Sequence, residues 1–234
     1  MQEWETPVTE VALSYSSADA PVFVASTSDD LTGSVSVGMR LRISQSTGGT
    51  KYFIVVAITN STITIYGGTD YTLNNETISS PVFSSAKAPL GFPLNPNKWT
   101  VSLTDTSDRN QSSPTNGTWY NLGSLSLDIP IGTWHVSYEV ELFLNILSAN
   151  ILDSRATLST SNNSESDSEL STRYVVQNLF CNTPFVTRGK VISLTSKTTY
   201  YLLGCSAQSS ANQLSFIAAT YGIPTKILAV CAYL

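Results

Sequence analysis

The stretch TWHVSYEVELFLNI at residues 133–146 decides the fold class of this 234-residue chain. Its even positions all carry apolar side chains: Trp134, Val136, Tyr138, Val140, Leu142, Leu144 and Ile146. Its odd positions are mostly polar and include His135, Ser137, Glu139, Glu141 and Asn145. Because side chains alternate between the two faces of a strand, this pattern predicts a long β-strand with one buried face.

The rest of the C-terminal part shows the same kind of pattern and no helical period. Further strands are expected at residues 99–105, 119–129, 155–161, 171–177, 185–194, 199–207, 213–220 and 226–234, with a polar loop at 108–117. Many short strands separated by Gly, Asn, Asp and Ser are typical of a β-sandwich. We therefore expect a C-terminal jelly-roll β-sandwich over residues 99–234.

The N-terminal part predicts a second, smaller β unit. Strands are expected at residues 21–25, 39–45, 51–59 and 62–66, which favours a small N-terminal β-barrel-like domain within residues 1–85. Between the two units lies AKAPLGFPLNPNK at residues 86–98, where prolines recur every three to four residues. Each proline fixes φ and removes a backbone donor, so we expect a stiff, extended Pro-rich linker.

The final predicted strand, 226–234, is apolar on both faces. An antiparallel strand with one solvent-exposed face would alternate between apolar and polar residues. Two interpretations stay open. The strand is central and covered on both sides, or it lines an interface between subunits.

Composition excludes several classes of partner. Charged residues make up 12% of the chain and the net charge is −5, whereas Ser and Thr together number 63 of 234 residues. Nucleic acids and anionic membranes require clustered Lys and Arg, which this chain lacks. No apolar run reaches the length of a membrane span, so membrane insertion is not expected.

No pattern predicts catalysis, a metal site or a cofactor. The single histidine, His135, and the pair Glu139 and Glu141 share the polar face of the central strand, without a nucleophile motif beside them. The three cysteines, an odd number at wide spacing, indicate neither a disulfide framework nor a zinc site. We therefore expect a protein that is not an enzyme and uses no cofactor and no metal.

Aromatic residues beside Asn, Ser and Thr are the candidates for contact with a saccharide: Trp119, Tyr120, Tyr174 and Tyr200. An aromatic ring offers a flat apolar face and, in Trp and Tyr, a polar handle. Packing in the core explains the same residues equally well.

Two pairs of stretches resemble known families. KYFIVVAITNSTITIYGGTDYTL (51–73) and SSAKAPLGFPLNPNKWTV (84–101) resemble a small N-terminal domain in tail proteins of phages and prophages of Gram-positive bacteria. IPIGTWHVSYEVEL (129–142) and TKILAVCAYL (225–234) are similar in strand pattern to the trimeric complement-globular-head and tumour-necrosis-factor-like jelly rolls.

The resemblance implies a receptor-binding protein of a phage tail, made in the host cytoplasm and located in the virion. Its implied partners are two further copies of itself in a homotrimer, other phage tail or baseplate proteins, and host cell-wall saccharide. The alternative is a structural virion component of the baseplate, neck or tail that binds no glycan.

Overall fold

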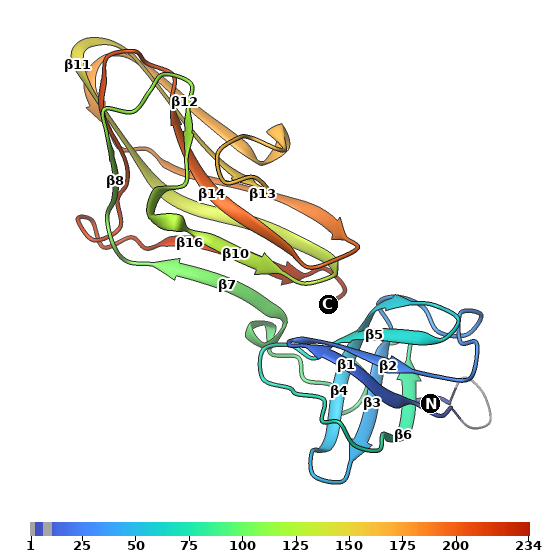
Figure 1. Cartoon of the computed structure of the whole chain (residues 1–234). Helices are drawn as coiled ribbons and strands as arrows, with labels where there is room; N and C mark the ends of the chain where they lie inside the picture. Colours follow the sequence, from blue (N-terminus) through green and yellow to red (C-terminus); the bar gives the residue numbers. More distant parts are fainter. Residues whose placement is uncertain (1–2, 7–10) are drawn as a thin grey trace.

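The computed structural model describes residues 3–6 and 11–234, with the side chains of 148–150 and 178–179 left aside. It confirms the all-β fold class, because regular structure in this part of the chain consists of strands and three single turns of 3₁₀ helix. Two β units lie end to end, and the C-terminal end of the chain lies near the junction between them (Figure 1). None of the helical segments is long and apolar enough to cross a membrane within the described residues.

The N-terminal unit is one antiparallel six-stranded sheet in the order β1-β2-β5-β4-β3-β6. Its strands are β1 (Ser14–Asp19), β2 (Val22–Ser26), β3 (Arg40–Gln45), β4 (Gly49–Ile58), β5 (Thr62–Tyr66) and β6 (Ser79–Ser84). The sheet surrounds its own core, which includes Phe23, Leu41, Phe53 and Ile65. In the described residues the edge strands β1 and β6 do not pair with each other, so the sheet is a partly open barrel.

The C-terminal unit is a sandwich made from ten strands. They are β7 (Thr100–Asp105), β8 (Arg109–Ser112), β9 (Trp119–Tyr120), β10 (Ser126–Ile129), β11 (Gly132–Ser159), β12 (Ser171–Asn182), β13 (Phe185–Leu194), β14 (Thr198–Ser206), β15 (Ala211–Phe216) and β16 (Thr225–Cys231). The 3₁₀ turns are η1 (Pro96–Trp99), η2 (Leu122–Ser124) and η3 (Ser168–Leu170).

Strand β11 organises the sandwich, because its 28 residues run through both layers. Its first part pairs with β13 and β16, and its last part pairs with β12 and β14. The ribbon turns back on itself at the end of the sandwich that lies away from the N-terminal unit (Figure 1). The even-numbered side chains from Trp134 to Ile146 are buried in the core, as the sequence predicts.

Strand β16 combines features of the two interpretations left open for it. It is central in its sheet, between β11 and β7. Its inner side chains Ile227 and Ala229 are fully buried, whereas Leu228 and Val230 on the outer face are only half-buried. The strand therefore has one covered face and one apolar face that no other layer of the described chain covers.

The prediction of a polar loop at 108–117 is wrong for its first part. Arg109–Ser112 forms β8, which pairs with β15 at the sheet edge. The strand contains no apolar side chain and is held by backbone pairing, so hydrophobic alternation could not reveal it.

The Pro-rich segment joins the two units closely and does not hold them apart. Phe92 from this segment stacks on Trp99 with ring centroids 5.0 Å apart. Tyr66 of β5 meets Trp134 of β11 edge to face at 5.1 Å. These residues belong to one continuous core cluster that includes residues of both units.

The guanidinium of Arg40 fixes this junction. The residue is only 1% exposed and lies over the Phe92 ring at 4.9 Å. Its nitrogens donate to the carbonyl oxygens of Lys87 (3.0 Å), Gly38 (2.6 Å) and Tyr233 (2.8 Å). One side chain therefore ties together β3, the Pro-rich segment and the segment after β16.

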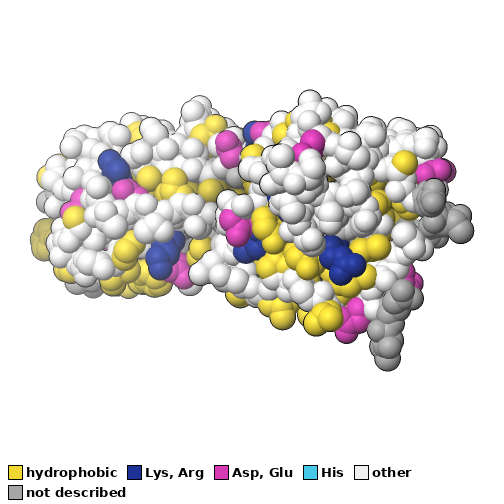
Figure 2. Space-filling model, turned by 90° about the horizontal axis from the view of Figure 1, so that it is seen from below, with side chains coloured by type: hydrophobic (Ala, Val, Ile, Leu, Met, Phe, Trp, Pro, Cys, Tyr) yellow, Lys and Arg dark blue, Asp and Glu magenta, His cyan; other side chains and the backbone are white. Residues whose placement is uncertain are grey.

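The face of the molecule drawn in Figure 2 carries few charged side chains. In Figure 2 white atoms dominate, charged side chains are scattered, and hydrophobic side chains gather in separate patches over both units. This agrees with a chain in which only 12% of the residues are charged.

Candidate functional site

The four aromatic candidates do not form one site. Tyr200 is 7% exposed and packs in the core of the sandwich, where burial raises the pKa of its hydroxyl. Its side chain is inside because it alternates with Tyr201 on β14, and sequence alone could not tell which of the two faces inward. Tyr200 therefore packs as a core residue, which is the other interpretation that the sequence left open.

Tyr120 and Tyr174 are half-buried, and their hydroxyls are already bonded. Tyr120 packs against the core, and its hydroxyl accepts a hydrogen bond from the Thr115 backbone N–H at 2.8 Å. The hydroxyl of Tyr174 accepts one from the Asn182 side-chain amide at 2.9 Å. Both rings have structural roles, so neither is the strongest candidate for ligand contact.

Trp119 on β9 differs from the other three tryptophans. Each of those donates its indole N–H to a backbone carbonyl: Trp4 to Leu90 (2.9 Å), Trp99 to Pro93 (2.8 Å) and Trp134 to Pro130 (2.8 Å). Trp119 is half-buried, and its indole N–H has no partner among the described residues. A tryptophan at the surface with an unused donor is suited to binding a ligand that is apolar on one face and polar at its edge.

The sheet register places two arginines in the same row as Trp119. Trp119 is paired with Cys205 of β14, Cys205 with Arg155 of β11, and Arg155 with Arg173 of β12. Directly paired residues in antiparallel strands point to the same side. These side chains therefore point to the same side of the sheet. Trp119 lies about 10 Å from Arg155, since neighbouring strands lie about 4.8 Å apart and the buried Cys205 is between them.

Asp153 holds both arginines in place. It lies two residues before Arg155 on the same face, and its carboxylate accepts from Arg155 at 3.3 Å and from Arg173 at 2.5–3.1 Å. Burial raises the pKa of Asp153, but the hydrogen bonds and charges of the two arginines outweigh burial and lower it overall. Asp153 is therefore ionised at neutral pH and keeps the two guanidinium groups side by side.

We call these residues the Trp119 face: Trp119, Asp153, Arg155 and Arg173. The face can bind a polyhydroxylated or anionic ligand non-covalently. The arginine side chains are 38% and 60% exposed, and each guanidinium has N–H groups without a partner in the described residues. The aromatic residue was a candidate from sequence. Its charged neighbours were not, because they come from strands more than 30 residues away that only the register of β14 brings into one row.

The acidic pair on the central strand has no partner suited to catalysis. Glu139 lies directly opposite Lys226, on the outer face that it shares with His135. Glu141 is 9% exposed, and burial raises the pKa of its carboxyl. Within the described residues no three His, Cys, Asp or Glu side chains are grouped so as to hold a metal ion.

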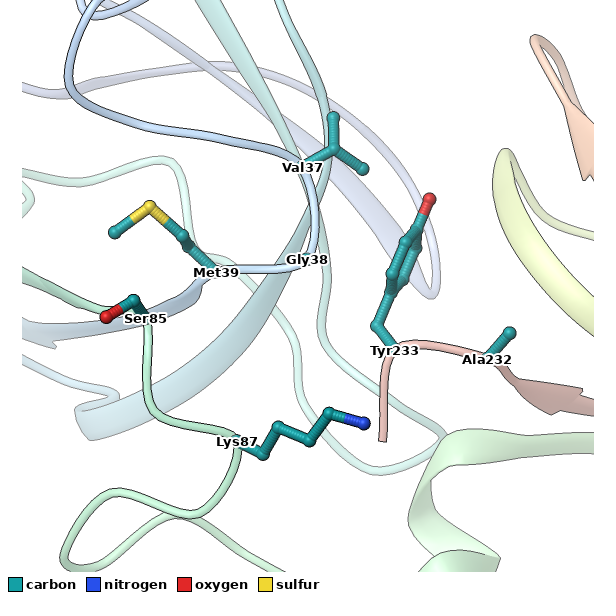
Figure 3. Close-up of a pocket in the computed structure, with 7 residues that line it drawn as sticks. All are labelled: Val37, Gly38, Met39, Ser85, Lys87, Ala232 and Tyr233. Carbon is teal, nitrogen blue, oxygen red and sulfur yellow. The ribbon is translucent and has the colours of Figure 1, made fainter.

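A pocket of about 310 Å³ lies at the junction of the two units (Figure 3). It is lined by Val37, Gly38, Met39, Ser85, Lys87, Ala232 and Tyr233. Gly38 has φ +93° and faces the Tyr233 ring, which would lie 3.2 Å from an added Cβ, so a glycine is required here. Lys87 donates to the Leu234 carbonyl at 3.2 Å, so the pocket is part of the contact between the units.

Comparisons with known proteins assign no family. No protein-family model matches the chain, and no curated protein matches it. Solved structures that align with it include infectious bursal disease virus of the Gx strain, with 11% identity over 95% of this chain and a TM-score of 0.29. A mutant VP2 protein from T=1 particles of the same virus gives 12% identity over 97% of this chain and 0.29.

An isomalto-dextranase of Arthrobacter globiformis complexed with panose gives 9% identity over 93% of this chain and a TM-score of 0.27. The chain spans 60% of the first viral protein, 76% of the second and 34% of the dextranase. TM-scores below 0.3 are too low to indicate a shared fold or function.

Proposed function

We propose that this protein is a non-enzymatic receptor-binding protein of a phage tail, which attaches the virion to saccharide on the host cell surface. The observation that carries the proposal is the Trp119 face. It combines an indole N–H that has no partner in the described residues with two guanidinium groups positioned by a buried carboxylate. The resemblance of residues 51–73 and 84–101 to tail proteins of phages and prophages of Gram-positive bacteria supports the same conclusion.

The chemistry of this face matches a sugar better than a peptide or a nucleic acid. A sugar ring presents C–H groups that pack on an indole and hydroxyl groups that accept from guanidinium N–H groups. The chain has a net charge of −5, which disfavours nucleic acid. In this proposal the N-terminal unit contacts other tail or baseplate proteins, and the chain assembles as a homotrimer.

The test is binding of the full chain to cell-wall saccharides from Gram-positive bacteria, measured by glycan array and calorimetry. Trp119→Ala should weaken binding by about 30-fold or more, which is the effect of removing a central aromatic contact. Arg173→Ala should weaken it by about tenfold. Tyr221→Ala is the matched control, because Tyr221 is an aromatic residue that is 57% exposed in the turn between β15 and β16.

Binding that survives Trp119→Ala would overturn the site while leaving the function open. A wild-type chain that binds no cell-wall saccharide would favour the second candidate, a structural virion component of the baseplate, neck or tail. The junction supports that alternative, because a shared core and the bonds of Arg40 make the two units one rigid piece.

A further inference from the structure

A second pocket at the junction of the two units takes no part in the proposed saccharide site. We call it the Asp128 pocket, after the acidic residue of β10 that lines it. Its volume is about 320 Å³, at the lower end of the range for small-molecule sites, about 300–1,000 Å³. Lys197, which also lines it, lies just before β14, at the opposite end of that strand from Cys205, the partner of Trp119. The pocket and the Trp119 face are therefore separate.

The N-terminal unit supplies the floor of the pocket. Val24 of β2 is directly opposite Thr64 of β5, and both line the pocket. Val22 lies two residues before Val24, on the same face of the sheet. This face is opposite to the one that buries Phe23 and Ile65 in the core of the N-terminal unit. The floor is therefore mainly apolar, and the pairing of β2 with β5 fixes it.

Turns of both units form the walls. Pro21 lies in the turn between β1 and β2, whereas Pro130 and Ile131 make the turn between β10 and β11. Ser196 comes from the turn between β13 and β14. A compact apolar group in this pocket would contact both units, and the removal of its surface from water favours binding.

The charged side chains of the pocket leave an excess of one negative charge. The Nζ atom of Lys197 is 2.8 Å from the Asp19 carboxylate, so these two residues form an ion pair across the junction. Lys197 also lies within electrostatic range of Asp128, so two carboxylates share one ammonium group. One Asp128 oxygen accepts from the Thr199 hydroxyl at 2.6 Å, and the other has no hydrogen-bond partner in the described residues.

We infer that the Asp128 pocket binds a compact organic ammonium ion. Its apolar part packs on Val22 and Val24, and its ammonium group donates to the free oxygen of Asp128. A hydrogen bond between two charged groups is stronger than one between neutral groups. The net charge of −5 on the whole chain also favours a cation over an anion. An inorganic cation would make no use of the apolar floor and needs several oxygen ligands.

The test is a binding titration of the full chain by ligand-detected NMR at pH 7. The probes share one ring and differ in charge: cyclohexylamine, which is protonated at this pH, cyclohexanol and cyclohexanecarboxylate. We expect a dissociation constant of about 1 mM for cyclohexylamine, which is within reach of so small a ligand. Cyclohexanol should bind about tenfold more weakly because it lacks the charge, and cyclohexanecarboxylate should not bind.

Asp128→Asn tests the charged contact. It should weaken cyclohexylamine about tenfold and leave cyclohexanol unchanged, because only the ammonium group uses the charge of Asp128. Asp30→Asn is the matched control, since Asp30 is an exposed acidic residue that does not line the pocket. It should leave the affinity for both probes as in the wild type.

Val24→Trp tests the location, because the larger side chain fills the space above the floor and should abolish binding of both probes. Ser196→Trp narrows the same pocket from an exposed turn, so the test does not depend on the folding of one variant. Val175→Trp is the matched control, since Val175 is 46% exposed on β12 and does not line the pocket. Circular dichroism checks the fold of each variant.

Equal affinities of the wild type for cyclohexylamine and cyclohexanol would overturn the preference for an ammonium ion. Binding that survives both tryptophan variants of the pocket would overturn its location. A wild-type chain that binds none of the three probes would overturn the inference as a whole. Trp119→Ala should leave cyclohexylamine binding unchanged, so the saccharide site is judged separately.

Discussion

Two buried charged side chains differ in their hydrogen bonding: Arg40 at the junction of the units and Glu141 on β11. Arg40 is 1% exposed, donates to three backbone carbonyls and stacks on Phe92. Glu141 is 9% exposed and has an oxygen without any partner in the described residues. The charge of Arg40 is therefore fully paired within the chain, whereas Glu141 is buried with one carboxylate oxygen that has no donor in the described residues.

The largest effect on stability is expected from replacing Arg40, the buried charge whose hydrogen bonds are all made. Arg40→Met keeps the length of the side chain but removes all three hydrogen bonds and leaves the carbonyls unpaired. We expect a loss of about 3 kcal/mol in the free energy of unfolding, since each bond from a charged donor contributes about 1.5–3 kcal/mol and part is recovered by the apolar replacement. Urea unfolding measures this loss and should also show two transitions in place of one.

Arg42→Met is the control for that variant. Arg42 is half-buried on the same strand and lies over the Trp4 ring at 5.0 Å. Its loss should cost only about 1 kcal/mol, which lies within the range of a partly exposed cation–π contact. Equal losses in the two variants would contradict a special role for Arg40.

A second pair of variants sharpens the comparison between satisfied and unsatisfied buried groups. The Tyr138 hydroxyl donates to the Ala156 carbonyl at 2.9 Å and lies 2.8 Å from the Thr172 hydroxyl, so Tyr138→Phe should cost about 1–2 kcal/mol. The Tyr66 hydroxyl is buried at the junction without a partner in the described residues. Tyr66→Phe should therefore be neutral or stabilise the protein by up to about 1 kcal/mol.

Thermal and urea unfolding of both variants give the difference directly. A Tyr66→Phe variant that loses as much stability as Tyr138→Phe would mean that the Tyr66 hydroxyl has a partner, such as a bound water.

The smallest effect concerns Glu76, an acidic residue whose acceptors are occupied, in contrast to Glu141. Hydrogen bonds from the side chains of Ser46 and Thr47 lower its pKa from 4.5 to about 2. Because the folded pKa is the lower one, the network stabilises the protein above pH 4.5, and this contribution is lost as the pH falls towards 2. Glu76→Gln should flatten the fall of the urea midpoint between pH 4.5 and 2, and an unchanged slope would contradict the network.

The sequence predicted those elements whose burial shows in the spacing of apolar residues. The alternation at residues 133–146 correctly identified the inner face of β11, and β13 spans the predicted 185–194. Strands β1, β6 and β8 were missed. β1 and β8 are polar edge strands held by backbone pairing, and β6 is a short edge strand in which Pro81, Val82 and Phe83 follow one another without alternation. Their partners are set by register, which a single sequence does not show.

The candidate site was predictable only for the residue that carries its own signal. Trp119 was a candidate as an aromatic residue beside polar ones, but Tyr200 had the same local sequence features and is in the core. The two residues differ in their burial: Trp119 of β9 is half-buried, whereas the side chain of Tyr200 on β14 points into the core. Arg155 and Arg173 gave no signal, because they become neighbours of Trp119 only through Cys205 of β14.

Strand β11 has a consequence for how the protein folds during synthesis. Its partners β12 to β16 all follow it in the chain, and Trp134 pairs with Cys231. At about 5–20 residues per second, the ribosome needs about 4–14 s to make the 72 residues from the end of β11 to the end of β16. During that time the apolar side of β11 has no native cover, and pairing between such distant segments is slow. The sandwich is therefore the part of the molecule that is exposed to aggregation while it is made, whereas the N-terminal unit can fold as soon as β6 leaves the ribosome.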